Sequence, residues 1–549
     1  MDKPLGFRFH KLSAVQANSS ISETCHRLAL LQKQVQQSKE IEAAISVAVK
    51  DLRKAMAPDG QPFIFTNNIE MNEQLVRSAL SRCDDIKYRS FRAGKAKALL
   101  VYLSGLTDTS KLEKTVIECL TGKLESNETF GDMNEITDLL ITAANVTVVE
   151  KPTEVITNIL KGNSLLLIDG ISDALSIDAA KYEKRQISKS ENEDVSKGPH
   201  DAFNETLSDN LALVRRRTKD PDLKVEIFEI GSRTQTPVAL LYVDDIVKPG
   251  LVDEIRNQLL SIDIDKVIIA ANIEEFLSNR IWNPFPQALA TERPDKIVAG
   301  LYEGRISIII DNSPSALMLP VSLQDFMQSV DDYTERPAVA SLTRFSRYVS
   351  LFIAVFLPAI YVSIVSYHPG MLPAGLAFSI AELRAKTPFP SLLEAFLMEG
   401  LLEIFQEAIV RLPQKLAAAA GVVGALVIGT TVVEAALVNA LLVVVIALTG
   451  LSTFSMPSYT FGMALRFFRI PALLASSVLG LYGVAIFAIV MIVFLCSLRT
   501  YDESYLGDLF DITLIADWKD GVVRLPAKFL TSRPKRLGPK DRTRLGGED

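Results

Sequence analysis

The sequence predicts a soluble N-terminal region of two small subdomains with α+β or α/β structure, followed by a multi-pass, all-α transmembrane domain. Three observations predict this. Charged residues are dense before residue 347 and after residue 498, whereas long apolar runs lie between them. Strand-like and helix-like segments alternate from residue 85 to residue 340. A chain of 549 residues is also longer than the chains that usually fold around a single hydrophobic core, so at least two domains are expected.

The composition excludes several classes of function. The net charge of −7 argues against a nucleic-acid partner. The four cysteines are scattered and form no CxxC pair, which indicates neither a disulfide framework nor a zinc site. GxSxG, Walker A and HExxH motifs are absent from the sequence. We therefore expect no catalytic residues, no metal site and no cofactor.

The soluble region divides into four segments. Residues 1–84 predict a polar, helical N-terminal extension without the apolar core of a signal peptide, so this region is expected in the cytoplasm. Residues 85–180 and 200–340 predict the first and second α/β subdomains. The charged, serine-rich run 181–199 between them predicts an exposed linker.

Hydrophobic patterns place individual elements in this region. Strands are predicted at residues 97–105, 164–170, 223–231 and 237–245, and helices at residues 110–122 and 251–262. The run 305–320 predicts a hairpin with its turn at residues 311–314.

Aspartates follow two of the predicted strands: Asp169 after one, and Asp244 and Asp245 after another. In an open α/β sheet, ligands bind at the carboxyl ends of the strands. The alternative is that these carboxylates are solvated turn residues, and the sequence favours this alternative.

The stretch PFPQALATERPDK, residues 284–296, combines prolines with a dense group of charges. The prolines fix the backbone and cannot continue a helix. The charged residues are Glu292, Arg293, Asp295 and Lys296. These charges can pair within or between subunits, and no nucleophile–base pair accompanies them. We interpret the stretch as a rigid elbow or subunit contact; the alternative is a surface turn with solvated charges.

Residues 344–500 predict a transmembrane domain of about four helices. The expected spans are residues 348–367, 390–411, 417–449 and 473–498. The first span is uncharged, can cross a hydrocarbon core of about 30 Å, and should be kinked by Pro358. Arg344 and Arg347 precede it, which places its start on the cytoplasmic side.

The last span is continuous in composition and leads into a basic cytoplasmic tail, residues 501–549. The basic residues of the tail include Lys528, Arg533, Lys535, Arg536, Lys540, Arg542 and Arg544. Both termini are therefore expected on the cytoplasmic side, which requires an even number of crossings.

The apolar run 421–451 is too long for one upright crossing, because a single helix of this length would measure about 46 Å. We expect it to tilt, bend or break, with residues 429–431 as the candidate break. The run carries Glu434, which indicates either a functional carboxylate or a neutral, hydrogen-bonded contact between helices.

The span 390–411 carries Glu399, Glu403 and Glu407 four residues apart, which places them on one face of a helix. Carboxylates on one face cannot point at lipid, so they must face protein or water. A ring of such helices would line a cation-favouring pore. The alternatives are a helix lying on the membrane surface, or a packed bundle in which Arg411 pairs with Glu407.

Several motifs in order resemble one known family. They include SLLLIDG, KGPHDAFNETLSDNLALVRRR, NPFPQALATERPDKIVAGLYEGRISIIIDNSP, PFPSLLEAFLMEGLLEIFQEAIVRLP, ALTGLSTFSMPSY and CSLRTY. From about residue 85 to residue 505, the chain resembles the A subunit of GerA-type spore germinant receptors. His200 stands where the family usually has arginine.

The resemblance implies a location in the inner membrane of dormant spores. It implies partners, namely a transporter-like B subunit and a lipoprotein C subunit, and an A subunit that forms homo-oligomers. It also implies a nutrient-gated cation channel that starts germination. The alternatives are a non-conducting scaffold of the receptor, or an ion-release amplifier like the sister family of stage V sporulation AF proteins.

Overall fold

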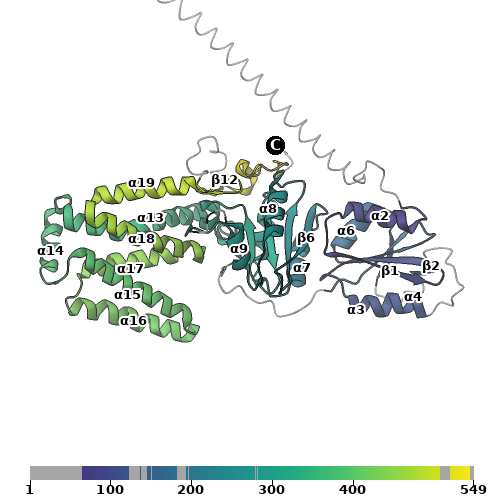
Figure 1. The fold of residues 1–549 in the computed structure, drawn as a ribbon, viewed down its shortest axis with the longest axis horizontal. Coiled ribbons are helices and arrows are strands. Elements are labelled where there is room, and N and C mark those ends of the chain that lie inside the picture. The colour runs from purple at the N-terminus through teal and green to yellow at the C-terminus, as the bar shows by residue number, and fades with distance from the viewer. Residues whose placement is uncertain are drawn as a thin grey trace, which may run out of the picture.

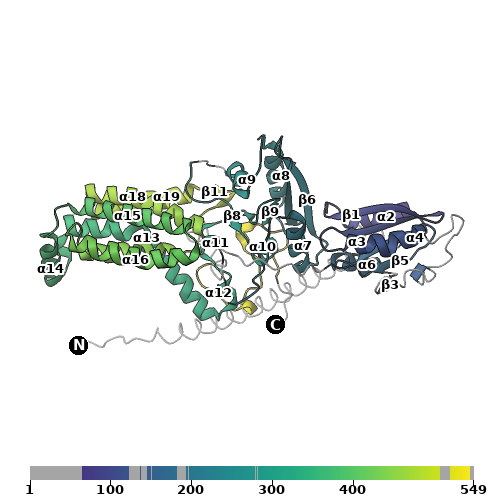
Figure 2. The same ribbon diagram turned by 90° about the horizontal axis from the view of Figure 1, so that it is seen from below.

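The computed structural model describes residues 65–122, 136–137, 145–149, 151–181, 193, 195, 197–278, 280, 282–506 and 520–544. The predicted extension up to residue 64, most of the predicted linker 181–199 and parts of the tail lie outside the described residues. Two sheet domains and a helical bundle follow one another along the long axis of the molecule (Figure 1, Figure 2). The two sheet domains are called the first and second domain below, and the helical region the bundle.

The first domain contains a five-stranded sheet with the order β1-β2-β4-β5-β3, in which every pair is antiparallel. Its strands are β1 (Ile86–Ala93), β2 (Ala96–Leu103), β3 (Val146–Val149), β4 (Ser164–Ile168) and β5 (Ala174–Ile177). The helices α2 (Ile69–Ala79) and α6 (Pro152–Leu160) cover one face. The other face is covered by one helical segment, which consists of α3 (Thr109–Leu112), a π-helical turn and α4 (Glu118–Gly122).

The second domain repeats this topology with the order β6-β7-β9-β10-β8, again all antiparallel. Its strands are β6 (Leu223–Ile230), β7 (Thr236–Val243), β8 (Leu289–Thr291), β9 (Ile306–Ile310) and β10 (Ala316–Leu319). The helices α7 (Leu207–Arg217) and α10 (Pro294–Leu301) pack on one face. The helices α8 (Leu251–Ser261) and α9 (Ala270–Leu277) pack on the other.

The same capping arrangement recurs at the first helix of each domain. The Asp169 carboxylate accepts a hydrogen bond from the backbone N–H of Ile69 at the start of α2 (3.2 Å). Asp311 accepts the equivalent bond from Leu207 at the start of α7 (2.9 Å). Each carboxylate satisfies a backbone donor that the helix leaves unpaired and lies at the positive end of its dipole. The repeated order and cap indicate that the two domains are copies of one unit.

The structure confirms a sheet-containing N-terminal region followed by a helical region, and of the two expected classes, α+β and α/β, its antiparallel sheets fit α+β. Strand–helix alternation is compatible with parallel strands, whereas every pair of neighbouring strands in the two five-stranded sheets is antiparallel. The pairs β1–β2, β4–β5, β6–β7 and β9–β10 join consecutive strands, and the other pairs are connected through longer segments that contain helices. The helix α2 also falls in the segment 1–84 that was expected to be a separate extension. Its residues Ile69 and Val76 are instead buried in the core of the first domain.

A buried ion pair joins the two sheet domains. Arg215 on α7 donates to both carboxylate oxygens of Asp85, at 2.7 and 3.0 Å, and both side chains are 1% exposed. Arg215 also donates to the carbonyl of Leu223 (3.0 Å). Backbone hydrogen bonds between residues 82–84 and Val225 reinforce the contact. The first domain is therefore tied to the second by both main chain and charge.

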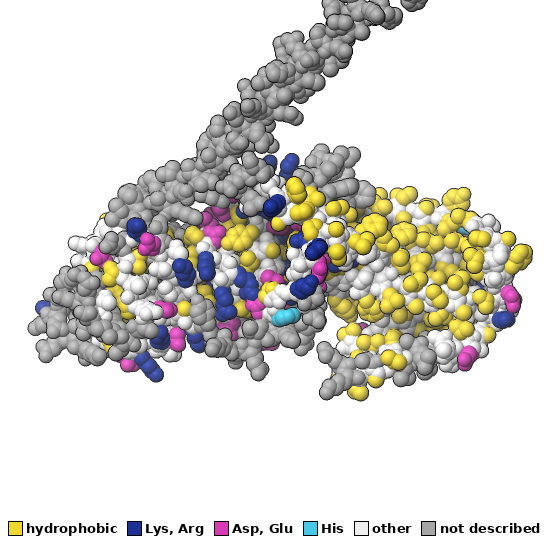
Figure 3. All heavy atoms as spheres, turned by 180° about the vertical axis from the view of Figure 1, so that it is seen from behind, with side chains coloured by type: hydrophobic (Ala, Val, Ile, Leu, Met, Phe, Trp, Pro, Cys, Tyr) yellow, Lys and Arg dark blue, Asp and Glu magenta, His cyan; other side chains and the backbone are white. Residues whose placement is uncertain are grey.

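The bundle begins with α13 (Pro337–Tyr367), in which Pro358 lies inside the helix. It continues with α14 (Ala374–Arg384), α15 (Ser391–Arg411), α16 (Gln414–Glu434), α17 (Ala440–Phe454), α18 (Tyr459–Leu479) and α19 (Leu481–Ser497). Among the described residues, α13 and α18 are long and apolar enough to cross a membrane, and α17 and α19 are shorter apolar helices. On the face that Figure 3 shows, hydrophobic side chains cover the bundle, whereas charged ones gather on the sheet domains.

Two of the four expected spans are each divided between two helices, and for the first of them a break was among the expected outcomes. The run 417–449 breaks at residues 435–439 rather than at 429–431: Ala436 adopts a φ of 53°, and Asn439 caps α17 through Leu441 N. The span 473–498 breaks at Gly480, whose φ is 61°. A Cβ there would lie 2.9 Å from His368 Nε2, so only glycine fits this reversal.

The described part of the tail lies on the second domain rather than extending into solvent. Arg533 donates to the Tyr302 carbonyl (2.7 Å), Arg536 to Asp325 (3.1 Å) and Arg544 to Glu303 (2.6 Å). The basic character of residues 520–544 is thus matched by acidic residues of this domain.

We predict that Asp85→Ala lowers the free energy of unfolding by about 3–5 kcal/mol, because it leaves the buried Arg215 guanidinium without its counter-ion. Thermal unfolding of the solubilised full-length chain measures the effect. Lys97→Ala is the control, since Lys97 forms an exposed pair with Glu70 that should contribute about 0–1 kcal/mol. Equal effects of the two changes would contradict the predicted role of the pair.

Candidate functional site: an ion-pair seam in the bundle and its joint to the second domain

Arg469 of α18 connects four helices inside the bundle. Its Nε donates to the carbonyl of Ala354 on α13 (2.8 Å), and its two terminal nitrogens donate to Glu399 on α15 (2.7 Å) and Thr453 on α17 (2.6 Å). The side chain is 2% exposed. A guanidinium has a fork of donors fixed in one plane, so these three acceptors determine how the four helices are rotated.

The three carboxylates expected on one face of α15 each lie beside an arginine. Glu399 is buried and pairs with Arg469, as described above. Glu403 is half-exposed and lies 3.5 Å from Arg466, also on α18. Glu407 is exposed and pairs with Arg411 one turn along its own helix (2.8 Å). Burial therefore decreases along the stripe from Glu399 to Glu407.

Further polar groups lie between α15, α17 and α18. We use the term polar seam for these groups together with Glu399, Glu403, Arg466 and Arg469. Gln406 is 3% exposed, and neither its Oε1 nor its Nε2 has a hydrogen-bond partner among the described residues. The same holds for Glu399 Oε1 and Arg466 Nε. Buried polar atoms normally find a partner, so the seam is chemically suited to water or a small ion.

Glu434, the other carboxylate singled out by the sequence, lies away from this seam. It is the last residue of α16 and is exposed. Glu394, one turn before Glu399, is 1% exposed and accepts hydrogen bonds from Thr387 Oγ1 (2.8 Å) and Asn439 N (3.2 Å). Glu394 thus fixes the connection that begins α17.

Phe285, in the PFPQ stretch, joins the second domain to the bundle. Its ring stacks on Phe468 of α18 at 4.9 Å between centroids and lies 6.4 Å from Phe494 of α19. Phe461 and Tyr505 complete the surroundings at 5.8 and 6.1 Å. The prolines around Phe285 hold it in an extended segment that reaches the base of the bundle.

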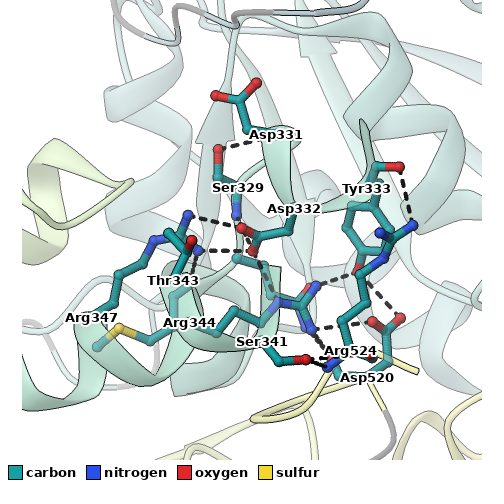
Figure 4. A network of polar contacts seen from close by, with 12 residues as sticks. Ser329, Asp331, Asp332, Tyr333, Ser341, Thr343, Arg344, Arg347, Asp520 and Arg524 are labelled. Carbon is teal, nitrogen blue, oxygen red and sulfur yellow. Dashed lines mark hydrogen bonds and ion pairs between the residues drawn. The ribbon is translucent and has the colours of Figure 1, made fainter. Parts of the chain in front are cut away.

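A second contact between domain and bundle centres on Asp332 (Figure 4). This carboxylate precedes α13 and pairs with Arg347 at 2.8 Å and Arg344 at 2.9 Å. Arg344 also reaches Asp520 of the tail (3.2 Å), so the start of α13 is held from two sides. These arginines, which the sequence assigned to membrane orientation, also anchor the first helix to the soluble region.

The acidic groups of this joint have shifted pKa values. Burial alone would raise the pKa of Asp332, but the neighbouring Arg347 and Arg344 hold it below its usual range. Burial likewise opposes ionisation of Asp325, and Arg305 and Arg536 outweigh it, so its pKa is also lowered. Burial raises the pKa of Asp520.

The charges of the elbow pair within the chain. Arg293 is buried, donates to Asp295 through two bonds of 3.1 and 2.8 Å, and donates to the Pro199 carbonyl (2.8 Å). Lys296 lies 3.2 Å from Glu193, a residue of the predicted linker. The backbone carbonyl of Glu292 accepts a bond from Phe203 N (2.8 Å). The elbow thus fastens the linker to α10.

The aspartates that follow the strands make contacts with other parts of the protein. Asp169 caps α2, and Asp244 lies 3.8 Å from Lys540 of the tail. Asp245 follows it in the turn after β7. The parallel-sheet rule that made them binding candidates does not apply to an antiparallel sheet.

Sequence reasoning missed Arg466, Arg469 and Asp332. The two arginines stand in the stretch RFFRIP between apolar residues, and this was the available signal, because charges inside a membrane span need partners. Asp332 carried no signal, since it lies among other acidic residues before the span.

These features define a membrane protein whose soluble sheet domains are tied to a helical bundle with paired internal charges. The family model of the Bacillus/Clostridium GerA spore germination proteins matches residues 74–536. The chain belongs to this family, as an A subunit, and is therefore a germination-receptor subunit and not an enzyme. The match extends beyond the expected 85–505 and includes much of the tail.

Individual relatives cover nearly the whole chain. Spore germination protein GerLA of Bacillus cereus is 35% identical over 504 residues, which are 92% of this chain and 98% of the relative. Spore germination protein B1 of Bacillus subtilis is 35% identical, covering 87% and 99%. Stage V sporulation protein AF of Bacillus subtilis is 29% identical, covering 84% and 92%.

Among solved structures, the N-terminal domain of the A subunit of the Bacillus megaterium germinant receptor GerK3 is similar. It is 29% identical with a TM-score of 0.38, and the match covers 46% of this chain and 95% of that domain.

We predict that acid weakens the joint. Because the pKa values of Asp325 and Asp332 are lowered in the folded chain, their contribution to stability is present above the unfolded value of about 3.9. It is lost as pH falls through the folded pKa values. Thermal unfolding between neutral and acidic pH measures this loss. Asp332→Asn should show a smaller dependence on pH; an unchanged profile in that variant would contradict the prediction.

We also predict that Phe285→Ala costs about 3–5 kcal/mol of stability, as expected when a buried aromatic ring is removed. The loss should appear at the contact between bundle and second domain, so proteolysis near residues 278–283 should accelerate. Phe276→Ala is the matched control, because this side chain is 47% exposed. If both variants resist protease like the parent, Phe285 does not hold the joint.

Proposed function

We propose that the chain is the A subunit of a nutrient germinant receptor in the spore inner membrane, and that it oligomerises into a nutrient-gated cation channel. Its partners would be a transporter-like B subunit and a lipoprotein C subunit. The observation that carries the proposal is the polar seam, because charged and amide side chains inside an apolar bundle indicate an ion or water pathway.

The arrangement of the helices supports a defined topology. Six helices, α13 and α15–α19 of the described residues, run back and forth between the two ends of the bundle. Six crossings would place both termini on the cytoplasmic, or core, side, as the positive-inside rule requires.

The graded burial of the stripe suggests different roles for its members. Glu399 is committed to Arg469 and would hold the helices in place. Glu403 and Glu407 are half-exposed or exposed, so an adjoining subunit could bring them to a shared ion path. Glu434 would lie near the far opening, and the elbow of Glu292, Arg293, Asp295 and Lys296 would transmit movement within the soluble region.

The pairing of every stripe carboxylate with an arginine favours a second candidate, a non-conducting scaffold that assembles the receptor. Its paired charges would be structural glue. A third candidate is an ion-release amplifier like stage V sporulation protein AF, although the identity to that relative is 29%, against 35% to GerLA.

Potassium efflux from dormant spores after addition of a nutrient mixture separates the first two candidates. We predict that Glu403→Gln and Glu407→Gln alter the rate or cation preference of efflux at matched protein levels, because they remove accessible charge from the path. Glu399→Gln should instead lower the amount of accumulated protein, because it leaves Arg469 buried and without its counter-ion.

Glu70→Gln is the control, since Glu70 is exposed on the first domain, away from the bundle. Normal efflux with Glu403→Gln and Glu407→Gln would exclude the stripe from the ion path and favour the scaffold. The partner subunits should be quantified in each strain, so that loss of assembly is distinguished from loss of conduction.

A further inference from the structure

Exposed apolar side chains gather on the second domain around α9. They are Leu260, Ile268, Ile269, Phe276 and Trp282. Trp282 is 97% exposed and Leu260 is 65% exposed. We call this group the α9 patch. All five lie between the end of α8 and the loop that follows α9, and exposed apolar patches of this kind usually mark an interaction surface.

Hydrogen bonds fix the residues that follow Trp282. The side chain of Asn283 accepts a hydrogen bond from Phe285 N (3.1 Å) and donates one to the Phe285 carbonyl (2.9 Å). The backbone N–H of Asn283 donates to the Arg280 carbonyl (3.1 Å). This turn directs Phe285 into the aromatic cluster of the bundle and leaves Trp282 outside. Three residues span at most about 10 Å, so Trp282 lies at the base of the bundle.

Two contacts fix the level of this loop along the bundle. Arg280 donates to Ser497 Oγ at the last residue of α19 (3.2 Å), and the Leu277 carbonyl accepts a bond from Tyr501 (3.3 Å). The 17 residues of α19 measure about 25 Å, close to the hydrocarbon thickness of about 30 Å. The loop therefore lies at the depth where the acyl chains meet the headgroups.

The patch continues a surface that faces lipid. The outer side of α19 presents Ile489, Val490 and Val493, each more than half exposed. Tryptophan is enriched at the membrane–water interface because its ring is apolar and its N–H can still bond to headgroups or water. We infer that the α9 patch inserts into the cytoplasmic headgroup boundary of the bilayer, with Trp282 as its deepest anchor.

The chemistry of the surroundings specifies the kind of lipid contact. The exposed carboxylates Asp263, Asp265 and Glu275 flank the patch, but Lys266 is exposed beside them and Asp265 pairs with Arg233 (3.6 Å), so little net charge is left to draw the patch to an anionic membrane surface. Insertion is therefore carried by apolar burial rather than by charge, and the partner is the phospholipid interface in general. The anchor would hold the second domain at a fixed height beside the bundle.

The chain has two tryptophans, Trp282 and Trp518, so the fluorescence of Trp282 can be measured alone once Trp518 is replaced. The full-length Trp518→Phe variant is reconstituted into phosphatidylcholine vesicles, with and without phosphatidylglycerol, that contain lipids brominated at shallow or deep acyl positions. We expect the emission of Trp282 to be shifted to the blue and quenched by the brominated lipids. The quenching should be strongest with bromines at shallow positions and equal with and without phosphatidylglycerol. The variant lacking both tryptophans gives the background.

Three results would overturn the inference. Emission that iodide quenches freely, without lipid quenching, would place Trp282 in water. Protection from both iodide and brominated lipid would show that another protein surface, such as a second copy, covers the patch. Quenching only with phosphatidylglycerol would assign the contact to charge. Phe276→Asp gives a second measurement: it should weaken the lipid quenching of Trp282, and Arg92→Asp on the first domain is its control.

Discussion

The ion pair between Arg469 and Glu399 is the constraint on which the arrangement of the bundle depends. A guanidinium inside an apolar region has to find acceptors, and Arg469 takes them from α13, α15 and α17. None of these helices can rotate without leaving a buried donor or charge unpaired. Apolar packing alone is less directional, because small rotations exchange one hydrophobic contact for another.

This constraint extends to the soluble region through α13 and α18. The helix α13 carries Ala354, which binds Arg469, and also Arg344 and Arg347, which bind Asp332. The helix α18 carries both Arg469 and Phe468, which stacks on Phe285. Each helix thus contacts the polar seam and the joint with the second domain. The Arg215–Asp85 pair continues the connection to the first domain, so the described parts form one mechanically linked chain of contacts.

Local patterns predicted much of the secondary structure, because they depend on neighbours in the sequence. The hairpin of β9 and β10 and the pairing of β6 with β7 follow from apolar runs separated by turn residues. The break at Gly480 was hidden, since hydropathy in a window measures composition and does not register a positive φ. The antiparallel pairing of strands that are distant in the sequence, such as β2 with β4 and β7 with β9, was equally hidden, because strand–helix alternation is compatible with both directions.

Part of the candidate site could likewise be predicted from the sequence, and part could not. The stripe on α15 could be predicted, since a spacing of four residues places carboxylates on one helix face. The partner of Glu407 could also be predicted, since Arg411 lies four residues further along the same helix. The partners of Glu399 and Glu403 could not, because Arg469 and Arg466 lie more than 60 positions further along the chain and meet α15 only through tertiary packing. The aspartates after the strands could not be assigned to one role for a related reason: a helix cap and a binding site place carboxylates at similar positions in a sequence.

The paired stripe is compatible with conduction because its ion pairs differ in strength. An exposed pair such as Glu407–Arg411 contributes about 0–1 kcal/mol, so a change in subunit packing can separate it at small cost. The buried Glu399–Arg469 pair costs about 3–5 kcal/mol to break when one partner is lost. If α15 and α18 move apart, the half-exposed Glu403–Arg466 pair should open first while the buried Glu399–Arg469 pair remains closed; the Glu407–Arg411 pair lies within α15 and opens independently of this movement. Because Arg469 stays bound to Glu399, it can hold α15 and α18 together at one level. Glu403, nearer the other end of α15, can then become available to ions while the bundle stays ordered.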